Sequence, residues 1–402
     1  MVNANMNDEY EQKILQFYNE TKEFESRIGI IIPMIFTIII ILGLFGNLLV
    51  VIVAFNRKMR NSTNILIIGL ACSDLTFLTL CVPFTAIDYA SPVWIFESWM
   101  CNMINYLQHA SAYSSVWTLS LMAVDRYLAV CHPVGSITLR NMRNTIGALL
   151  IINAVIFISQ VPVAKIHGIY EYDFIIETRS TCAIITIATG EASITEREYV
   201  LIFQARLYFF SFNVFGYLLP LGITCFLYYF MLKRLWYSSI SKNYAMGLSL
   251  RSRPETVKAK RKATRLVLFV VIIWAFCWLP LNICFLLSGI FYPETLVTKG
   301  GKMMVIVQIS SQVLAYMNSC LNPILYAFLS DNFRKGFLHV LRITINAFTL
   351  GQCCVINHPN DRYDFATLNG TIKRNRKLLI RPVLQDSNCQ KLTMIDNDDE
   401  FI

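Results

Sequence analysis

The chain has 402 residues, of which 55% are hydrophobic and only 15% are charged. A soluble protein of this length would carry far more charge on its surface, so the composition excludes an ordinary soluble enzyme or binding module. The formal net charge of +9 comes largely from bases gathered in a few connecting segments. We therefore interpret it as a sign of membrane topology and expect no nucleic-acid partner.

Seven apolar blocks follow one another, and each is longer than the ~20 residues that a helix needs to cross ~30 Å of hydrocarbon. Only helices and closed barrels satisfy the backbone in lipid, and the blocks lack the strict alternation of barrel strands. We expect an all-α membrane protein with a seven-transmembrane helix bundle over residues 28–329. The predicted spans are residues 28–55, 64–89, 100–131, 145–166, 201–235, 266–291 and 303–329.

Lysine and arginine gather in the connections after the first, third and fifth predicted spans. Basic connections stay in the cytoplasm, so the N-terminus is predicted outside and the C-terminus inside. Residues 1–27 are polar and acidic, without the pattern of a signal peptide, and form a predicted extracellular segment. Within it, Asn19 begins a glycosylation acceptor triplet.

After the last span, residues 330–345 place Phe333 and Phe337 at fourfold spacing among basic residues. This pattern predicts a short amphipathic helix on the inner leaflet. Cys353 and Cys354 follow and are either palmitoylation sites or unmodified thiols. Residues 346–402 are polar and are predicted to be a disordered cytoplasmic tail.

Asp74 is a carboxylate in the middle of the second predicted span. A lone Asn or Ser in a span most often bonds a neighbouring helix, but an ionised carboxylate needs a partner or a cation. Ser115, Asn318 and Asn322 add only oxygen ligands to it. This set of ligands suits an allosteric sodium ion, and we expect no other cofactor.

Asp125 and Arg126 are adjacent charges near the cytoplasmic end of the third span. One interpretation is a structural ion pair near the interface. The other is a two-state element in which Arg126 leaves Asp125 to engage a partner from inside. Five prolines offer hinges within the spans; they are Pro83, Pro162, Pro220, Pro280 and Pro323.

Five motifs occur in a fixed order along the spans: "GNLLVV", "LACSD", Asp125-Arg126-Tyr127, "CWLP" at residues 277–280 and "NPILY" at residues 322–326. In this order and spacing, over residues 29–342, the chain resembles the rhodopsin-like G-protein-coupled receptors. A narrower likeness, in "VPFTAIDYASPVW", "MAVDRYLAVCHPV", "QVPVAKIHG" and "FNVFGYLLPL", is to allatostatin-A and galanin receptors.

The resemblance implies an outer disulfide between Cys101 and Cys182, a sodium pocket around Asp74, and a cytoplasmic cleft that opens for a heterotrimeric G protein of the Gi/o type. Arrestin is a further implied partner. The implied activation switch comprises Asp125, Arg126, Tyr127, Val116, Pro220, Tyr228, Trp274, Trp278, Pro280, Pro323 and Tyr326.

Three positions depart from the family pattern. Asn153 stands where the fourth span usually has a tryptophan, which puts a stacking contact with the second helix in doubt. Trp274 replaces the usual phenylalanine of the switch layer. Lys260 stands where some relatives place an acid that holds Arg126, so the restraint is expected from Asp125, with the Thr264 hydroxyl as a further candidate.

Gln108 stands where amine receptors carry a carboxylate, and Tyr316 where a retinal protein needs a lysine. Apolar and amide groups dominate the predicted cavity, which favours a peptide with aromatic and leucine side chains and an amidated end. His109 either contacts this ligand or merely packs against a neighbour. The cavity is predicted from Phe84, Asp88, Asn105, Gln108, His109, Leu281, Asn282, Phe285, Gln308, Gln312 and Tyr316.

The loop around Cys182 alternates in "TCAIITIA", which predicts a β-hairpin lid in the second extracellular loop. We therefore expect a plasma-membrane receptor for an amidated neuropeptide of the allatostatin-A/galanin type. The five histidines are scattered, so an enzyme is not expected. The alternatives are a receptor of the same fold for another peptide class, or a membrane transporter, although no half-to-half repeat is visible.

Overall fold

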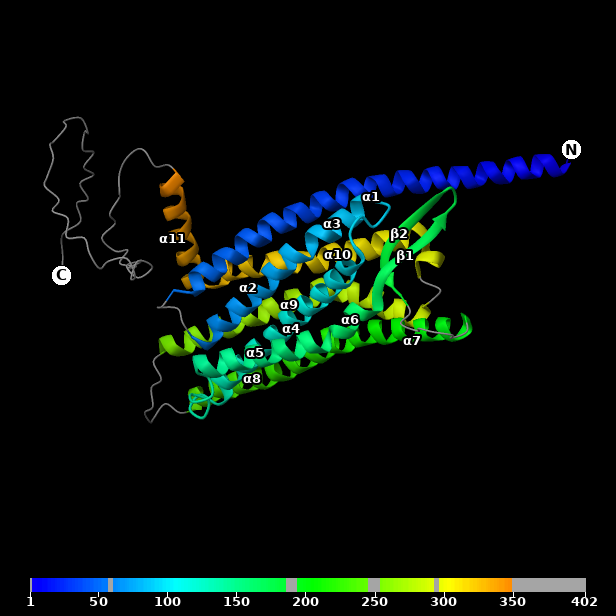
Figure 1. Cartoon of the computed structure of the whole chain (residues 1–402). Coiled ribbons are helices and arrows are strands. Elements are labelled where there is room, and N and C mark those ends of the chain that lie inside the picture. The colour runs from blue at the N-terminus through cyan, green and yellow to red at the C-terminus, as the bar shows by residue number, and fades with distance from the viewer. Residues whose placement is uncertain (1, 57–60, 186–193, 245–253, 293–295, 349–402) are drawn as a thin grey trace, which may run out of the picture. The chain divides into compact units, whose positions relative to one another are not determined.

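The computed structural model describes residues 2–56, 61–185, 194–244, 254–292 and 296–348. Cys353, Cys354, the predicted tail from residue 349 onward and the Lys260 side chain lie outside the described part of the structure. The described chain is mainly a bundle of long helices (Figure 1). Its helices are α1 (Val2–Ala54), α2 (Ser62–Leu80), α3 (Val82–Ala90), α4 (Ser98–Cys131), α5 (Met142–Ser159), α6 (Val161–Ile166), α7 (Ile194–Asn213), the π-helix η2 (Val214–Leu218), α8 (Leu219–Tyr244), α9 (Pro254–Phe291), α10 (Leu296–Leu329) and α11 (Asp331–Phe348).

Six stretches of described helix are long and apolar enough to cross a membrane: Glu9–Ala54, Ser62–Ala90, Met142–Ile166, Thr195–Arg234, Thr264–Phe291 and Gly300–Phe328. The predicted third span lies in α4, which is not among the six. The reason is that α4 carries many polar residues, and it buries them, including Ser111, Ser114, Ser120 and Thr118, in a bundle where it packs against α2, α5, α8 and α9. The helical bundle is thus confirmed, while the seventh crossing stays a prediction.

Prolines act on the helices in two ways. Pro83 and Pro162 stand in the first turn of α3 and α6, just after α2 and α5 end, because proline lacks the amide hydrogen that would continue the preceding helix. Pro280 and Pro323 remain inside α9 and α10. Pro220 follows the π-helix η2, and π-helical turns inside α-helices are frequent at functional sites.

The N-terminal segment and the first predicted span belong to one helix. Helix α1 runs from Val2 to Ala54 through the boundary predicted at residue 27, and the extracellular position of its first part stays a prediction. Pairs one turn apart stabilise this stretch, with Lys13 Nζ 2.7 Å from Glu9 Oε1 and Arg27 Nη2 2.5 Å from Glu23 Oε1. Further along, Ile38, Ile41 and Phe45 are more than half exposed, as in a helix that faces lipid.

The predicted β-hairpin is present. Strand β1 (His167–Phe174) pairs antiparallel with β2 (Glu177–Ile184), and Ile169 lies opposite Cys182. Residues 186–188 of the predicted "TCAIITIA" strand lie outside the described residues, and the strand preceding the turn supplies the partner. Figure 1 shows the hairpin at one end of the bundle, which we call the hairpin end, with α11 at the opposite end.

The bundle is held by apolar clusters that meet at one residue. Trp278 packs against three clusters of buried apolar side chains. One of these contains Phe333 and Phe337 of α11, so the predicted amphipathic helix docks its apolar face on the bundle and ends three residues later than predicted. Gly336 allows this approach, because a Cβ there would lie 2.5 Å from Val53 Cγ1.

Candidate ligand cavity, cation site and charged switch

A cavity of about 300 Å³ opens among α2, α3, α4, α7, α9, α10 and the hairpin. It contains ten of the eleven predicted ligand residues: Phe84, Asp88, Asn105, Gln108, His109, Leu281, Phe285, Gln308, Gln312 and Tyr316. Asn282 does not line it. Its side chain is buried and donates to the Trp278 carbonyl at 2.9 Å instead.

Aromatic residues that the sequence analysis did not select also line the cavity. Tyr208 and Phe212 lie one turn apart on α7, and Tyr89 and Trp94 add further rings. The i, i+4 spacing of Tyr208 and Phe212 was a usable signal, because it places both rings on one helix face. Nothing in the local sequence indicated that this face turns toward the cavity.

A chain of hydrogen bonds crosses the cavity from α3 to α4. Tyr89 Oη donates to Gln312 Oε1 at 2.6 Å, and Gln312 Nε2 donates to Tyr316 Oη at 2.8 Å. Gln108 Nε2 donates to the same Tyr316 oxygen. The floor of the cavity is therefore neutral and built from amides and phenols.

His109 is almost fully buried, and its Nδ1 lies 2.9 Å from the Asn105 carbonyl. Its ring centroid is 5.1 Å from Tyr208 and 5.2 Å from Phe212. Its Nε2 has no hydrogen-bond partner among the described residues. The ring is thus packed against its neighbours, and its second nitrogen is buried without a hydrogen-bond partner among the described residues.

Asp88 is the one carboxylate that lines the cavity in the described part of the chain. No hydrogen bond or ion pair joins it to another described residue. A half-buried carboxylate without a partner favours a cationic group on the ligand. The cavity therefore offers one charged and several neutral polar contacts.

The predicted disulfide is confirmed. Cys101, in the first turn of α4, is joined to Cys182 of β2, 81 residues away. Asn105 Nδ2 lies 3.1 Å from Cys182 Sγ and donates to the Cys101 carbonyl at 3.0 Å. The disulfide thus ties the hairpin to α4 directly beside the cavity.

The hairpin is also held by α1. Buried Arg179 of β2 lies 2.8 Å from Glu25 and 2.6 Å from Glu177, and its guanidinium stacks 4.0 Å from the Phe174 ring. Burial opposes the charge of Arg179, but its hydrogen bonds to Glu25 and Glu177 outweigh this and raise its pKa. The hydrogen bond from Arg179 lowers the pKa of Glu177. The helical N-terminal segment thus clamps the hairpin, and only the fold revealed this.

Asp74 lies fully inside the bundle. Ser319 Oγ donates to its Oδ1 at 3.0 Å, and Asn322 Nδ2 donates to its Oδ2 at 2.8 Å. The oxygens of Ser115 and Asn318 are buried, and neither has a partner among the described residues. A carboxylate with orphaned oxygens on neighbouring helices fits the ligand chemistry of a hard cation. Ser319 is a partner that the sequence analysis missed.

The Asp125 carboxylate accepts hydrogen bonds from several residues besides Arg126, which follows it in the sequence. Arg126 Nη2 donates to it, and Arg140 Nε donates to Asp125 Oδ1 at 2.9 Å. Ser62 Oγ and Thr63 Oγ1 donate to the same carboxylate at 2.9 Å and 2.7 Å. The ion pair is therefore the centre of a buried network that joins α2, α4 and the segment before α5.

Several other predicted switch residues pack in the apolar core of the bundle. The rings of Trp274 and Tyr217 of η2 pack at a tilt with their centroids 5.3 Å apart, and Tyr217 Oη donates to the Ala275 carbonyl at 2.9 Å. The hydroxyls of Tyr228 and Tyr326 are buried without a partner among the described residues. Val116 is buried in the same cluster as Trp274, Tyr228 and Tyr326, whereas Tyr127 pairs its ring with His132.

Asn153 stands where the family usually has a tryptophan, and it joins α5 to its neighbouring helices by hydrogen bonds. It accepts a hydrogen bond from Ser114 Oγ at 2.5 Å, and Ser114 Oγ lies 2.7 Å from Ser73 Oγ. A polar contact thus links α2, α4 and α5 where we questioned a stacking contact. The interface is retained with different chemistry.

A helical bundle with a hairpin tied to α4, a buried carboxylate and the adjacent charges Asp125 and Arg126 is typical of seven-helix receptors. The chain matches the profile of the 7 transmembrane receptor (rhodopsin family) over residues 46–326. It is 59% identical over 361 residues to the "Galanin-like G-protein coupled receptor npr-9" of Caenorhabditis elegans, covering 87% of this chain and 82% of that one.

The likeness extends to insect and vertebrate receptors. The chain is 40% identical over 332 residues to the "Allatostatin-A receptor" of Bombyx mori, covering 80% of this chain and 84% of the other. It is 33% identical over 316 residues to "Galanin receptor type 1" of Homo sapiens, covering 77% and 81%. The chain belongs to the rhodopsin family of seven-transmembrane receptors, which are multi-pass membrane proteins and not enzymes.

Proposed function

We propose that the chain is a receptor for an amidated neuropeptide of the allatostatin-A/galanin type and that it activates a heterotrimeric G protein of the Gi/o class. Relatives with printed peptide-receptor names support the ligand class. Family membership also decides against the transporter that we considered as an alternative. The hairpin end then faces the outside and α11 the cytoplasm.

The observation that carries this proposal is the aromatic, amide-rich cavity, in whose lining the buried His109 Nε2 has no hydrogen-bond partner among the described residues. A carboxamide at a peptide end both donates and accepts hydrogen bonds, and it brings no charge into the cavity. His109 and the amide of Gln308 supply matching neutral groups, while Phe212 and Phe285 accommodate aromatic or leucine side chains. Asp88 favours a peptide that also carries a cationic group.

For activation toward the cytoplasmic side, we propose three steps. Agonist binding turns Trp278 and Trp274, releases Arg126 from Asp125, and brings Arg126 to Tyr228. The buried hydroxyls of Tyr228 and Tyr326, which have no hydrogen-bond partner in the described part of the chain, support this step. Sodium at Asp74, Ser115, Asn318 and Asn322 would favour the resting state. It would supply a positive charge that the buried carboxylate lacks.

Modification and regulation complete the proposal. Asn19 is exposed on α1 and is proposed to be glycosylated. Cys353 and Cys354 are proposed to be palmitoylated and to hold the tail at the inner leaflet beside α11. Arrestin is the proposed partner of the active state.

The test is nucleotide exchange on a purified Gi/o heterotrimer, with the chain in lipid nanodiscs and a library of amidated peptides. We expect at least one such peptide to stimulate exchange, with its free-acid form about tenfold weaker or more, because a carboxylate would be buried without a partner. Equal potency of acid and amide, or no response to any amidated peptide, would overturn the ligand class.

Two substitutions distinguish a hydrogen bond between His109 and the peptide from mere packing of the His109 ring. His109→Phe keeps a ring against Tyr208 but removes Nε2. It should weaken the peptide about threefold to tenfold, as expected for one neutral hydrogen bond of about 0.5–1.5 kcal/mol. His167→Phe is the matched control, because that ring also packs on Tyr208 and lies outside the cavity lining. An unchanged affinity in His109→Phe would leave this residue a packing role only.

A further inference from the structure

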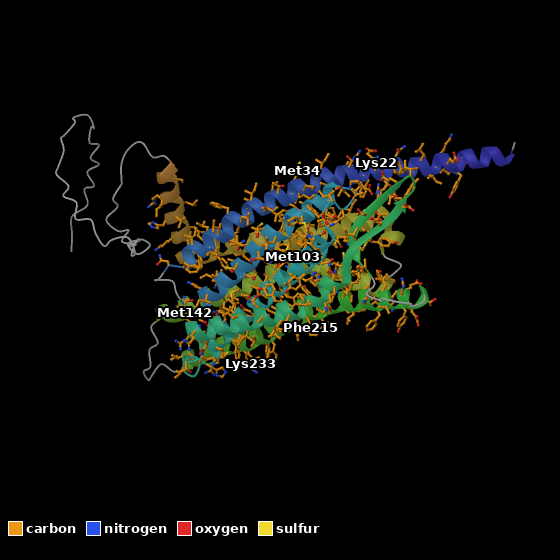
Figure 2. All side chains as sticks on the ribbon, viewed as in Figure 1. Lys22, Met34, Met103, Met142, Phe215 and Lys233 are labelled. Carbon is orange, nitrogen blue, oxygen red and sulfur yellow. A yellow bond between two sulfur atoms is a disulfide. The ribbon has the colours of Figure 1, made fainter. Side chains whose placement is uncertain are left out.

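A second cavity lies on the side of the bundle, between α4, α5, α6 and α7, and has a volume of about 880 Å³. Its rim is apolar and faces the surroundings of the bundle: Val155, Phe203, Leu207 and Phe215 are each more than half exposed. Figure 2 labels Phe215 on this part of the molecule. In a membrane protein, such a rim is in contact with hydrocarbon, so the groove is open to lipid.

Gln204 of α7 lines this groove and is nine-tenths buried. Neither its Oε1 nor its Nε2 has a hydrogen-bond partner among the described residues. An amide that is removed from water with both ends unsatisfied is costly, and in hydrocarbon no water replaces the lost bonds. Something that both donates and accepts hydrogen bonds is therefore expected beside it.

The rest of the lining restricts that partner. No Lys, Arg, Asp or Glu is among the described residues that line the groove, so an ionised head group would have no counter-charge. Tyr113, Trp117 and Phe215 offer flat aromatic surfaces. A rigid apolar body loses less conformational entropy on such surfaces than flexible acyl chains do. The volume lies within the range of about 300–1,000 Å³ that small-molecule sites occupy.

We propose that this groove binds a neutral bilayer lipid of the sterol class, with its single hydroxyl hydrogen bonded to the carboxamide of Gln204. A hydroxyl donates one hydrogen bond and accepts others, so it can satisfy both ends of the amide. The sterol rings lie along the aromatic wall of α4 and the exposed side chains of α7.

The site is distinct from the ligand cavity but shares a wall with it. Tyr208 lines both cavities. Tyr113, at the back of the groove, donates from Oη to the Ser211 carbonyl at 3.2 Å and packs its ring 5.7 Å from Phe212. A bound sterol thus contacts residues that also support the rings around His109.

A comparable groove between α2, α4 and α5, of about 580 Å³, serves as the control. One amide in its lining, Asn153, already accepts from Ser114 and donates to the Leu149 carbonyl at 2.8 Å. The Asn153 amide is thus engaged within the protein. Of the two amides compared, Gln204 is the one without a partner among the described residues.

The experiment uses the full chain in phosphatidylcholine nanodiscs with a photoactivatable sterol that keeps its free hydroxyl. Cross-linked residues are located by mass spectrometry. We expect saturable labelling within residues 155–166 and 200–215, reduced at least fivefold by Gln204→Leu and unchanged by Asn153→Leu. Unlabelled sterol should compete, and its O-methyl ether, which cannot donate, should compete at least fivefold less well.

A second variant keeps the test decisive if Gln204→Leu folds poorly. Val155→Trp changes an exposed rim residue, leaves Gln204 intact, and should reduce labelling by filling the groove. Sterol should also raise the melting temperature of the wild type more than that of either variant. Equal labelling of wild type and both variants, or equal competition by the methyl ether, would overturn the proposal. Neither readout requires a peptide or a G protein. A negative result would therefore contradict the sterol site without contradicting the proposed receptor function.

Discussion

Arg140 Nε lies 2.9 Å from Asp125 Oδ1, so the carboxylate that neighbours Arg126 in sequence binds a second arginine fifteen residues further along the chain. The Asp125 side chain is 6% exposed and that of Arg140 is 25% exposed. With two arginines and two hydroxyl donors, Asp125 is held firmly in place whether or not Arg126 remains bound to it. The resting position of Arg126 therefore depends on a network, and each member can be tested.

Arg140→Gln should raise basal nucleotide exchange, because it removes one charge that keeps Asp125 oriented toward Arg126. A partly exposed ion pair contributes about 0.2–1 kcal/mol, so the increase should not exceed about fivefold. The control is Arg143→Gln, a change of the same type at an exposed residue nearby. A decrease in basal exchange, or the same effect from both variants at matched surface expression, would contradict this role of Arg140.

Arg126→Ala should reach the surface and bind peptide but catalyse little exchange. Arg126 is proposed to leave Asp125 only in the active state, so its loss removes an interaction specific to that state. Linkage then requires the G protein to lose most of its effect on agonist affinity, an effect typically of about 5–150-fold. Radioligand binding with and without G protein measures this directly.

Asp125→Asn should have the opposite effect on nucleotide exchange to Arg126→Ala. It weakens the hold on Arg126 while keeping the hydrogen-bonding shape, so basal exchange should rise. Normal exchange by Arg126→Ala would show that the charged pair is architectural and that the proposed switch is wrong.

Asp74→Asn should abolish the ability of sodium to weaken agonist binding. The substitution removes the negative charge but leaves an amide that still fits between Ser319 and Asn322. Agonist binding is compared in sodium and in potassium at equal ionic strength, with Ser73→Ala, one residue away, as the control variant. Full sodium sensitivity in Asp74→Asn would exclude this carboxylate as the cation ligand.

Glu177→Gln should lower the melting temperature near pH 6, and this deficit should shrink as the pH falls below about 4. The pKa of Glu177 is lowered by Arg179, so its charge stabilises the hairpin clamp above the ordinary glutamate value of about 4.3. That contribution is lost as the pH falls through the lowered pKa, where the carboxylate takes up a proton. The control is Glu171→Gln, which changes an exposed carboxylate of the neighbouring strand β1. A Glu177→Gln deficit that stays the same size as the pH falls would mean that charge is not the cause.

Much of the molecule follows from local sequence. The apolar blocks predicted the helices, alternation around Cys182 predicted the hairpin, and the ordered motifs indicated the family. Ten cavity residues were also predictable, because a matched motif fixes both the helix and the face on which a residue lies. Local patterns suffice here because helix formation and lipid exposure depend on composition over a few turns.

Pairings between distant side chains were decided only by the tertiary structure. Arg140 reaches Asp125, Glu25 reaches Arg179, and Tyr208 separates two cavities, yet none of these relations has a local signature. Each depends on how one helix is rotated and shifted against another, which is set by packing over the whole bundle. The amide of Gln204 shows the same limit. Its residue type is visible in the sequence, but only the fold shows that it is buried with no hydrogen-bond partner among the residues that the structure describes.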